Sequence, residues 1–137
     1  MKTRVLADTA FWVALFDARD EHHQAAADAW KRTGDAWTPI TTQHIVDETM
    51  TYLNCSLRDH AKAMAFHERM RGSGIPVFSA TETVREQALD IFFRFADKDF
   101  SFTDCVSFAV MKNEGITQYA GFDDHFKAMG FQPIVSS

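Results

Sequence analysis

Short apolar runs alternate along this chain with segments in which apolar residues recur every three or four positions. The short runs predict strands, and the periodic segments predict amphipathic helices. Strands are expected at residues 4–8, 37–42, 75–80, 117–122 and 131–135. Helices are expected at residues 11–16, 23–30, 45–53, 63–70 and 84–95, and one further helix contains Asp104 and stops at Gly115.

Helix-start signals sharpen two of these boundaries. Thr83 and Glu86 have the spacing of a capping box, which predicts the start of the helix at residues 84–95. Ser101 and Asp104 have a similar spacing just before an apolar run.

The alternation of strands and helices predicts the fold class. Strands separated by helices imply right-handed crossovers and a parallel sheet that is covered on both faces. The chain has 137 residues, which is the size of one ordinary domain, and it contains no internal repeat or linker. We expect a single α/β domain over residues 1–137, with four or five parallel strands flanked by helices on both faces.

Composition agrees with a folded protein of the cytoplasm. Hydrophobic residues make up 46% of the chain, including thirteen Phe and three Trp, so a compact core is expected, with the segment FWVALF inside it. Cys55 and Cys105 are isolated and are interpreted as small buried hydrophobes. The N-terminus starts like a signal peptide, but Asp8 interrupts the apolar run, and no stretch approaches transmembrane length.

The charge of the chain limits how it could bind nucleic acid. The formal net charge is −5, and Lys and Arg form no block. Proteins that hold nucleic acid by neutralising phosphates are usually basic. If the substrate is a nucleic acid, a bound divalent cation is the simplest way to offset the phosphate charge.

Acidic residues stand where the predicted strands end and the next helices begin. Asp8 closes the first strand, and Asp123 and Asp124 follow the fourth, while Glu48 and Asp104 lie near helix starts. The carboxyl ends of parallel strands and the following helix starts share one edge of a sheet, so these acids are candidates for one cluster. Mg²⁺ and Mn²⁺ favour oxygen ligands, and such ions can activate water and stabilise charge on a phosphate.

Several of these acids also have local interpretations. Asp104 could complete a capping box with Ser101 and favour the helix dipole. Asp124 and His125 could form a solvated turn. Asp104 therefore has two open roles, helix cap and metal ligand.

The acids after the second strand have a local interpretation as well. Asp47 and Glu48 could favour the dipole of a helix that Thr42 caps. Asp8 is different, because an acid that directly follows the apolar residues VLA is partly desolvated and needs a cation, hydrogen-bond donors or a raised pKa.

Other catalytic sites have weaker support. His44 and Glu48 are four residues apart, but the second His of a zinc-protease motif is missing. The chain contains no Gly-rich phosphate loop and no nucleophile-elbow serine. A phosphohydrolase with Asp8 as nucleophile usually has a second Asp two residues later, where this chain has Ala10.

Four segments together resemble a known family. VLADTAFWVALFDARDEHHQAA, TTQHIVDETMTYL, FSFTDCVSFAVMK and YAGFDDHFKAMGF follow one another in the order of a PIN domain, in the small form of the VapC toxins. The resemblance extends from Arg4 to Phe131 and implies a metal-dependent ribonuclease that hydrolyses RNA phosphodiester bonds. The alternative is a catalytically silent module on the same fold that binds RNA or protein.

The resemblance also assigns roles to the acids. It implies that Asp8, Asp104 and Asp123 hold one or two Mg²⁺, with Mn²⁺ as a substitute. Glu48 would bind metal or orient the attacking water. Asp124 is the alternative to Asp123 as the fourth acid.

Neighbouring residues match supporting positions of the family. Thr9, Ser101 and Thr103 match small hydroxyl positions beside the acids, and Asp20 and His23 match structural positions. In one departure, Gly121 stands where the family often has Thr or Ser, two residues before the fourth acid. As partners, the resemblance implies an RNA substrate, a homodimer and a small cognate antitoxin that covers the acidic pocket. No membrane contact and no DNA binding by this chain alone are expected.

Overall fold

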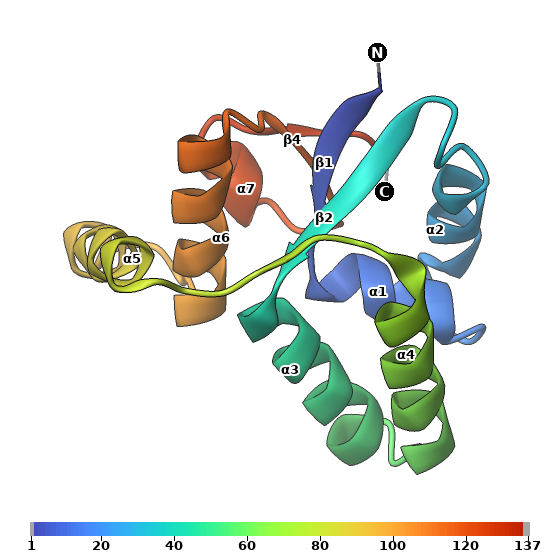
Figure 1. The fold of residues 1–137 in the computed structure, drawn as a ribbon. Coiled ribbons are helices and arrows are strands. Elements are labelled where there is room, and N and C mark those ends of the chain that lie inside the picture. The colour runs from blue at the N-terminus through green and yellow to red at the C-terminus, as the bar shows by residue number, and fades with distance from the viewer. Residues whose placement is uncertain (1, 136–137) are drawn as a thin grey trace.

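Five parallel strands form the centre of the computed structural model, which describes residues 2–135 (Figure 1). The strands lie in the order β3-β2-β1-β4-β5. Their bounds are Thr3–Ala7 for β1, Trp37–Thr42 for β2, Val77–Phe78 for β3, Gln118–Ala120 for β4 and Gln132–Pro133 for β5. Because β1 is central and pairs with both β2 and β4, the residue that follows it emerges between two neighbouring strand ends.

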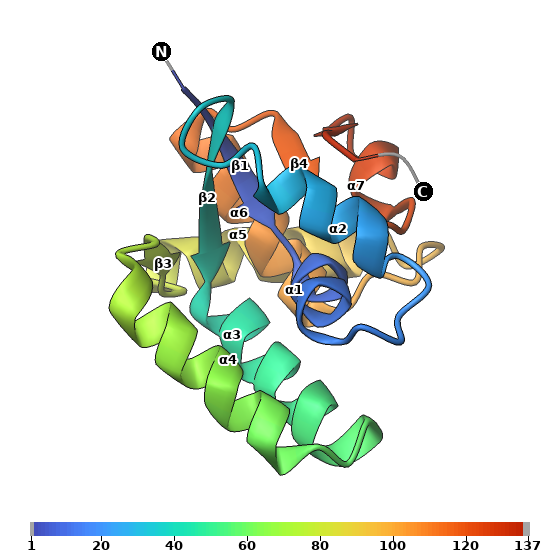
Figure 2. The same ribbon diagram turned by 90° about the vertical axis from the view of Figure 1, so that its right-hand side faces the viewer.

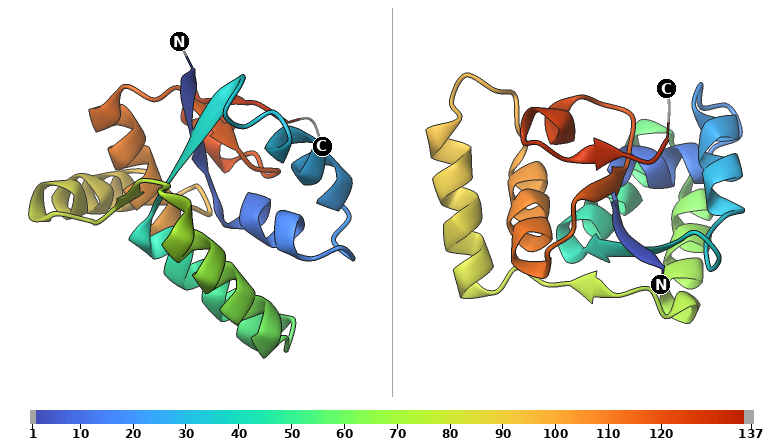
Figure 3. Two further views of the ribbon diagram at one scale, coloured as in Figure 1. Left: turned by 45° about the vertical axis from the view of Figure 1, so that its right-hand side comes forward. Right: turned by 90° about the horizontal axis from the view of Figure 1, so that it is seen from above.

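Within residues 2–135, seven α-helices and one π-helix surround the sheet. Helices α5 and α6 lie on one side of it, and α1, α2 and α4 lie on the other (Figure 3). Helices α3 and α4 run side by side beyond the sheet (Figure 2). The bounds are Thr9–Phe16 for α1, His23–Trp30 for α2, Gln43–Thr51 for α3, Tyr52–Ser56 for the π-helix η1, His60–Ser73 for α4, Glu82–Arg94 for α5, Phe102–Glu114 for α6 and His125–Ala128 for α7.

The core forms on both faces of the sheet. Val5, Leu6 and Ala7 of β1 are fully buried, as the apolar run predicts for a central parallel strand. Phe11 and Trp12 of α1 are also buried, so the segment FWVALF belongs mainly to the core, as expected. The predicted fold class, a parallel sheet flanked by helices, is confirmed.

Two local predictions are wrong. Helix α5 begins at Glu82, and its cap is Thr81, whose hydroxyl accepts a hydrogen bond from the Val84 amide at 3.2 Å. The capping box predicted at Thr83 therefore does not form, because the helix starts before the residues that show its apolar period. Cys55 is exposed, since Leu53 is the buried residue of η1, whereas Cys105 is buried as expected. Within residues 2–135, none of the helices is long and apolar enough to cross a membrane.

Candidate active site

Asp8 lies at the point where β1 ends and α1 begins. Its amide donates to the Ala120 carbonyl at 3.1 Å, which extends the pairing of β1 with β4 by one residue. Its Oδ1 accepts from the Phe11 amide at 3.1 Å and caps α1. The preceding carbonyl, of Ala7, accepts from Trp12 Nε1 and from Thr41 Oγ1, both at 3.1 Å. The sheet and the helix therefore fix the Asp8 carboxylate, which is only 6% exposed.

Gly121 lies directly against this carboxylate. A Cβ atom at position 121 would stand 2.5 Å from Asp8 Oδ2 and 2.8 Å from both Asp8 Cγ and Oδ1. Such distances are too short for a side chain at position 121 unless the Asp8 carboxylate or the backbone shifts. The departure from the family pattern thus has a physical reason in this chain, because the position that would carry a hydroxyl is filled by the carboxylate itself.

Asp104 forms the predicted capping box. Its Oδ2 accepts from the Ser101 amide at 3.1 Å, and the Ser101 hydroxyl accepts from the Asp104 amide at 3.0 Å. The same Oδ2 lies 2.9 Å from His125 Nδ1. His125 is half-buried and bound to Asp104, so its interpretation as part of a solvated turn is wrong. The reason is that α7 begins at His125 and turns this ring back toward the start of α6.

Glu48 reaches the same pocket as Asp104, from α3. Thr9 Oγ1 donates to Glu48 Oε1 at 2.6 Å, which joins the first residue of α1 to α3. Thr42 caps α3 as expected, by accepting from the Ile45 amide at 3.1 Å. However, the first turn of α3 contains no acid, so the dipole interpretation of Asp47 and Glu48 is wrong, because the dipole effect is confined to the first turn.

The two adjacent acids after β4 differ in position. Asp123 lines the same pocket as Asp8, and its Oδ1 accepts from the His125 amide at 3.1 Å. The Asp124 side chain is 89% exposed and lies 3.7 Å from Lys127. Asp124 is not among the residues that line this pocket.

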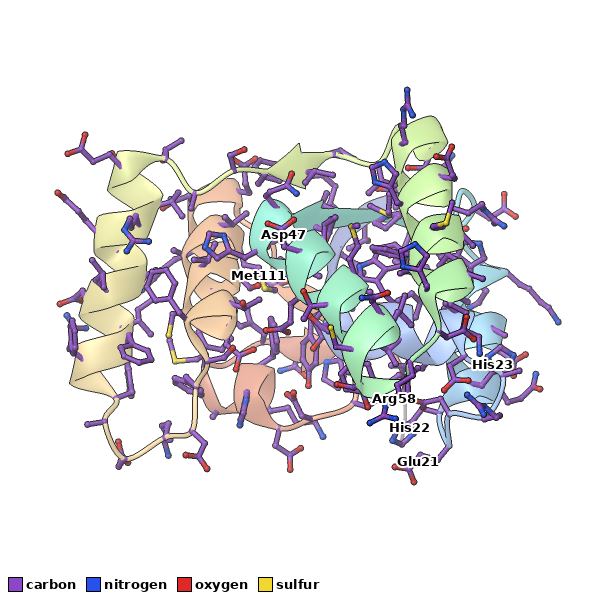
Figure 4. All side chains as sticks on the ribbon, turned by 90° about the horizontal axis from the view of Figure 1, so that it is seen from below. Glu21, His22, His23, Asp47, Arg58 and Met111 are labelled. Atoms are coloured by element: carbon purple, nitrogen blue, oxygen red, sulfur yellow. The ribbon has the colours of Figure 1, made fainter. Side chains whose placement is uncertain are left out.

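One pocket of about 340 Å³ brings the four predicted site acids together. Small hydroxyl residues and a group of aromatic rings complete its wall. The lining includes Asp8, Thr9, His22, Glu48, Tyr52, Thr103, Asp104, Phe122 and Asp123. Figure 4 labels His22, on the loop before α2, and Arg58, which follows η1, at the same edge of the view.

The pocket concentrates negative charge on a buried group. Burial raises the pKa of Asp8 well above its ordinary value, and the charges of Asp123, Asp104 and Glu48 raise it further. Burial also raises the pKa of Asp104, although hydrogen bonds from Ser101 and His125 oppose this shift. Among the residues that the structure describes, no Lys or Arg lines the pocket. A bound cation would relieve this repulsion, and carboxylate oxygens are the ligands that Mg²⁺ and Mn²⁺ favour.

The carboxylates do not stand in a closed ligand set. Within residues 2–135, no group of three or more His, Cys, Asp or Glu side chains lies close enough to hold a metal ion. Glu48 is bound to Thr9, Asp104 to its helix cap and Asp123 to the next turn. Each acid thus has a partner of its own, as mutual repulsion favours, and the assignment of the four as metal ligands stays a prediction.

The segment between α1 and α2 has mainly structural contacts. His23 Nδ1 lies 2.7 Å from the Ala14 carbonyl and joins α2 to α1. Asp20 Oδ1 accepts from the His22 amide at 2.8 Å and shapes the loop, although Asp20 also lines the pocket. His22, Tyr52 and Phe122 were not predicted as site residues. Tyr52 fits the apolar period of the helix expected at residues 45–53, and no sequence pattern brings the three rings together.

The fold and this arrangement of acids can be compared with known proteins. Residues 5–132 match the PIN domain family. The chain belongs to the PIN domain family. It is 34% identical over 130 residues to the 23S rRNA-specific endonuclease VapC20 of Mycobacterium tuberculosis, in two strains, covering 95% of this chain and 97% of the relative. The resemblance to a VapC-type PIN domain is therefore confirmed.

Solved structures agree with this assignment. The crystal structure of M. tuberculosis VapC20, described as a sarcin–ricin loop cleaving toxin, superposes with a TM-score of 0.88 at 32% identity, covering 96% of this chain and 98% of the other. FitAcB of Neisseria gonorrhoeae superposes with a TM-score of 0.65 at 19% identity, covering 94% and 95%. The similarity to FitAcB shows a shared fold.

Proposed function

We propose that this PIN-domain protein is an endoribonuclease that depends on Mg²⁺ or Mn²⁺ and is the toxin of a toxin–antitoxin pair. The observation that carries the proposal is the convergence of acids from four separate segments on one pocket, around the buried Asp8. The family match and the relative named as an endonuclease support RNA cleavage over a silent module.

In the proposed mechanism, Asp8, Asp104 and Asp123 would hold the cation, and Glu48 would hold it or orient the attacking water. When bound, the cation would polarise the phosphate and stabilise the charge that develops during phosphodiester hydrolysis. The chain itself holds the acidic side chains in place. The Phe11 amide and the surface of Gly121 hold Asp8.

Two further contacts prepare the other acids. Thr9 holds Oε1 of Glu48 and leaves Oε2 for water or metal. Ser101 and His125 both bind Oδ2 of Asp104, which would leave Oδ1 to hold a cation. The helix cap and the metal ligand are thus compatible roles of one carboxylate, since each uses a different oxygen.

The first test changes two acids and one control. Asp8→Asn and Asp104→Asn should fold, as judged by circular dichroism, but lose cleavage of RNA in Mg²⁺ or Mn²⁺ and bind the cation more weakly in calorimetry. Asp124→Asn, a matched change outside the pocket, should cleave like the wild type. Undiminished cleavage by either pocket variant would refute the assignment. Binding of RNA without cleavage by the wild type would favour the silent module.

The substrate can be proposed more narrowly. The relatives at 34% and 32% identity are described as acting on 23S rRNA and its sarcin–ricin loop. We infer that this chain cuts the same kind of ribosomal RNA loop, and therefore acts in the cytoplasm. Primer extension on 23S rRNA from treated ribosomes should reveal one main cut in this loop. Cuts scattered over the ribosomal RNA would contradict this specificity.

A homodimer and a small antitoxin complete the proposal. The acidic pocket suits a cationic side chain such as Arg, through which an antitoxin could block the site. Light scattering should report a dimer of the free protein. Co-expression with the product of a small adjacent gene should suppress cleavage, whereas the free chain should not bind duplex DNA.

A further inference from the structure

The pocket has an aromatic wall in addition to its acidic residues. The rings of His22 and Phe122 are stacked, with centroids 4.2 Å apart and planes inclined by 7°. Tyr52 lines the same pocket and is 42% exposed. These three residues, here called the aromatic wall, come from the loop before α2, the start of η1 and the loop after β4.

The aromatic wall is only partly explained by the core. Phe122 packs against the core and is half-buried, like His22, but Tyr52 is one of the exposed large side chains of residues 2–135. Rings that converge on a polar pocket and keep part of their surface in solvent are typical of a binding surface for a flat ligand.

The backbone at Tyr52 is also irregular. Tyr52 is the first residue of the π-helix η1, which interrupts the α3–α4 hairpin. Short π-helices inside α-helical segments frequently occur at functional sites, because the wider turn changes the direction of a side chain. Arg58, after η1, has φ of 53° and is the one residue other than glycine with positive φ in the described part of the chain. This segment therefore departs from regular helix beside the pocket.

We propose that the aromatic wall binds the base of an unpaired nucleotide adjacent to the phosphate that the acids cleave. The inference rests on the proposed function, since it places that phosphate at the acids. Proteins that read single-stranded RNA commonly stack bases on aromatic side chains, and every base has a face that can stack. The acids of the same pocket would repel an acidic peptide, whereas a nucleotide can bring its phosphate to a cation and its base to the rings.

The experiment pairs protein variants with an altered RNA. The probe is a short single-stranded oligoribonucleotide that the wild type cuts at one place, with an abasic residue introduced at each position around the cut. Binding is followed by fluorescence anisotropy in Ca²⁺, which takes oxygen ligands as Mg²⁺ does, and cleavage is followed separately in Mg²⁺. The variants are Tyr52→Ala, Tyr52→Phe and, as a control, Phe93→Ala, which removes a ring that is 72% exposed on α5.

Stacking predicts a specific coupling. Tyr52→Ala should weaken binding of the intact oligonucleotide by roughly tenfold, the order found for one base–aromatic stack. It should have no effect on the oligonucleotide that lacks the base at one position next to the cut, because both changes remove the same contact. Tyr52→Phe should bind normally, since the ring remains. Phe93→Ala should match the wild type.

The outcomes separate this inference from the proposed function. If Tyr52→Ala weakens binding of the intact oligonucleotide and of every abasic oligonucleotide equally, the stacking site is overturned, even if cleavage is normal. Coupling in the binding assay without cleavage would support the stacking site and refute the nuclease assignment. Absence of any RNA binding would overturn both.

Discussion

The close approach of Gly121 to Asp8 leads to a quantitative prediction for Gly121→Ala. The new Cβ would stand 2.5 Å from Asp8 Oδ2, about 0.9 Å inside the 3.4 Å at which ordinary contact begins. The carboxylate cannot simply rotate away, because Oδ1 accepts from the Phe11 amide at 3.1 Å. A shift of this size would break that helix cap or displace the end of β4.

The expected loss of stability follows from these two consequences. Overpacking a buried site typically costs 1–3 kcal/mol, and a lost N-cap typically costs about 1 kcal/mol. A shift that relieves the overpacking breaks the helix cap, so the two costs do not add. We therefore expect a net loss of roughly 1–3 kcal/mol in the free energy of unfolding. For a domain of this size, that corresponds to a fall in melting temperature of roughly 4–12 °C. Cleavage should fall more strongly, since displacement by about 1 Å can greatly reduce catalysis.

Thermal unfolding and cleavage assays can test this reasoning with two controls. Gly72→Ala introduces the same methyl group in α4, where nothing lies within 4 Å, and should be neutral or slightly stabilising because Ala favours helix. In an Asp8→Ala background, Gly121→Ala should cost much less, because the clashing carboxylate is gone. An equal cost in both backgrounds would refute the proposed clash.

Three further predictions concern the acids. Burial and the charge of Asp123 raise the pKa of Asp8, so wild-type stability should fall as the pH rises above the ordinary value of 3.8. Asp8→Asn should therefore raise the melting temperature of the metal-free protein at neutral pH. It should not do so in acid, where Asp8 is protonated. Asp123→Asn should impair cleavage and Asp124→Asn should not, and the reverse result would exchange their roles. Thr9→Val should preserve the fold and slow cleavage, because Glu48 loses its 2.6 Å hydrogen bond; an unchanged rate would show that this bond does not position Glu48.

The fold was predictable because its signals are local and repeated. Short apolar runs such as VLA and longer periodic segments give the order of strands and helices, and the rules of parallel sheets give the layers. Boundaries were less accurate. The start of α5 depends on Thr81, whose hydroxyl bonds to the backbone before the apolar period begins, and no hydrophobic pattern marks that position.

The acids were also predictable, because strand ends and helix starts share one edge of a parallel sheet. Their contacts were not. The bond between His125 and Asp104 joins residues 21 positions apart, and that between Thr9 and Glu48 joins residues 39 apart. Such contacts depend on how the elements pack. The space beside Asp8 that requires Gly121 is likewise a property of packing.

The two hydrogen bonds that the Ala7 carbonyl accepts limit how the protein can open. This carbonyl is held by side chains from α1 and β2, and the adjacent Asp8 amide is held by β4, so three elements must separate before this segment can open. In native-state hydrogen exchange, the Asp8 amide should therefore exchange only through global unfolding. Local melting of this segment is then no route to switch the protein off.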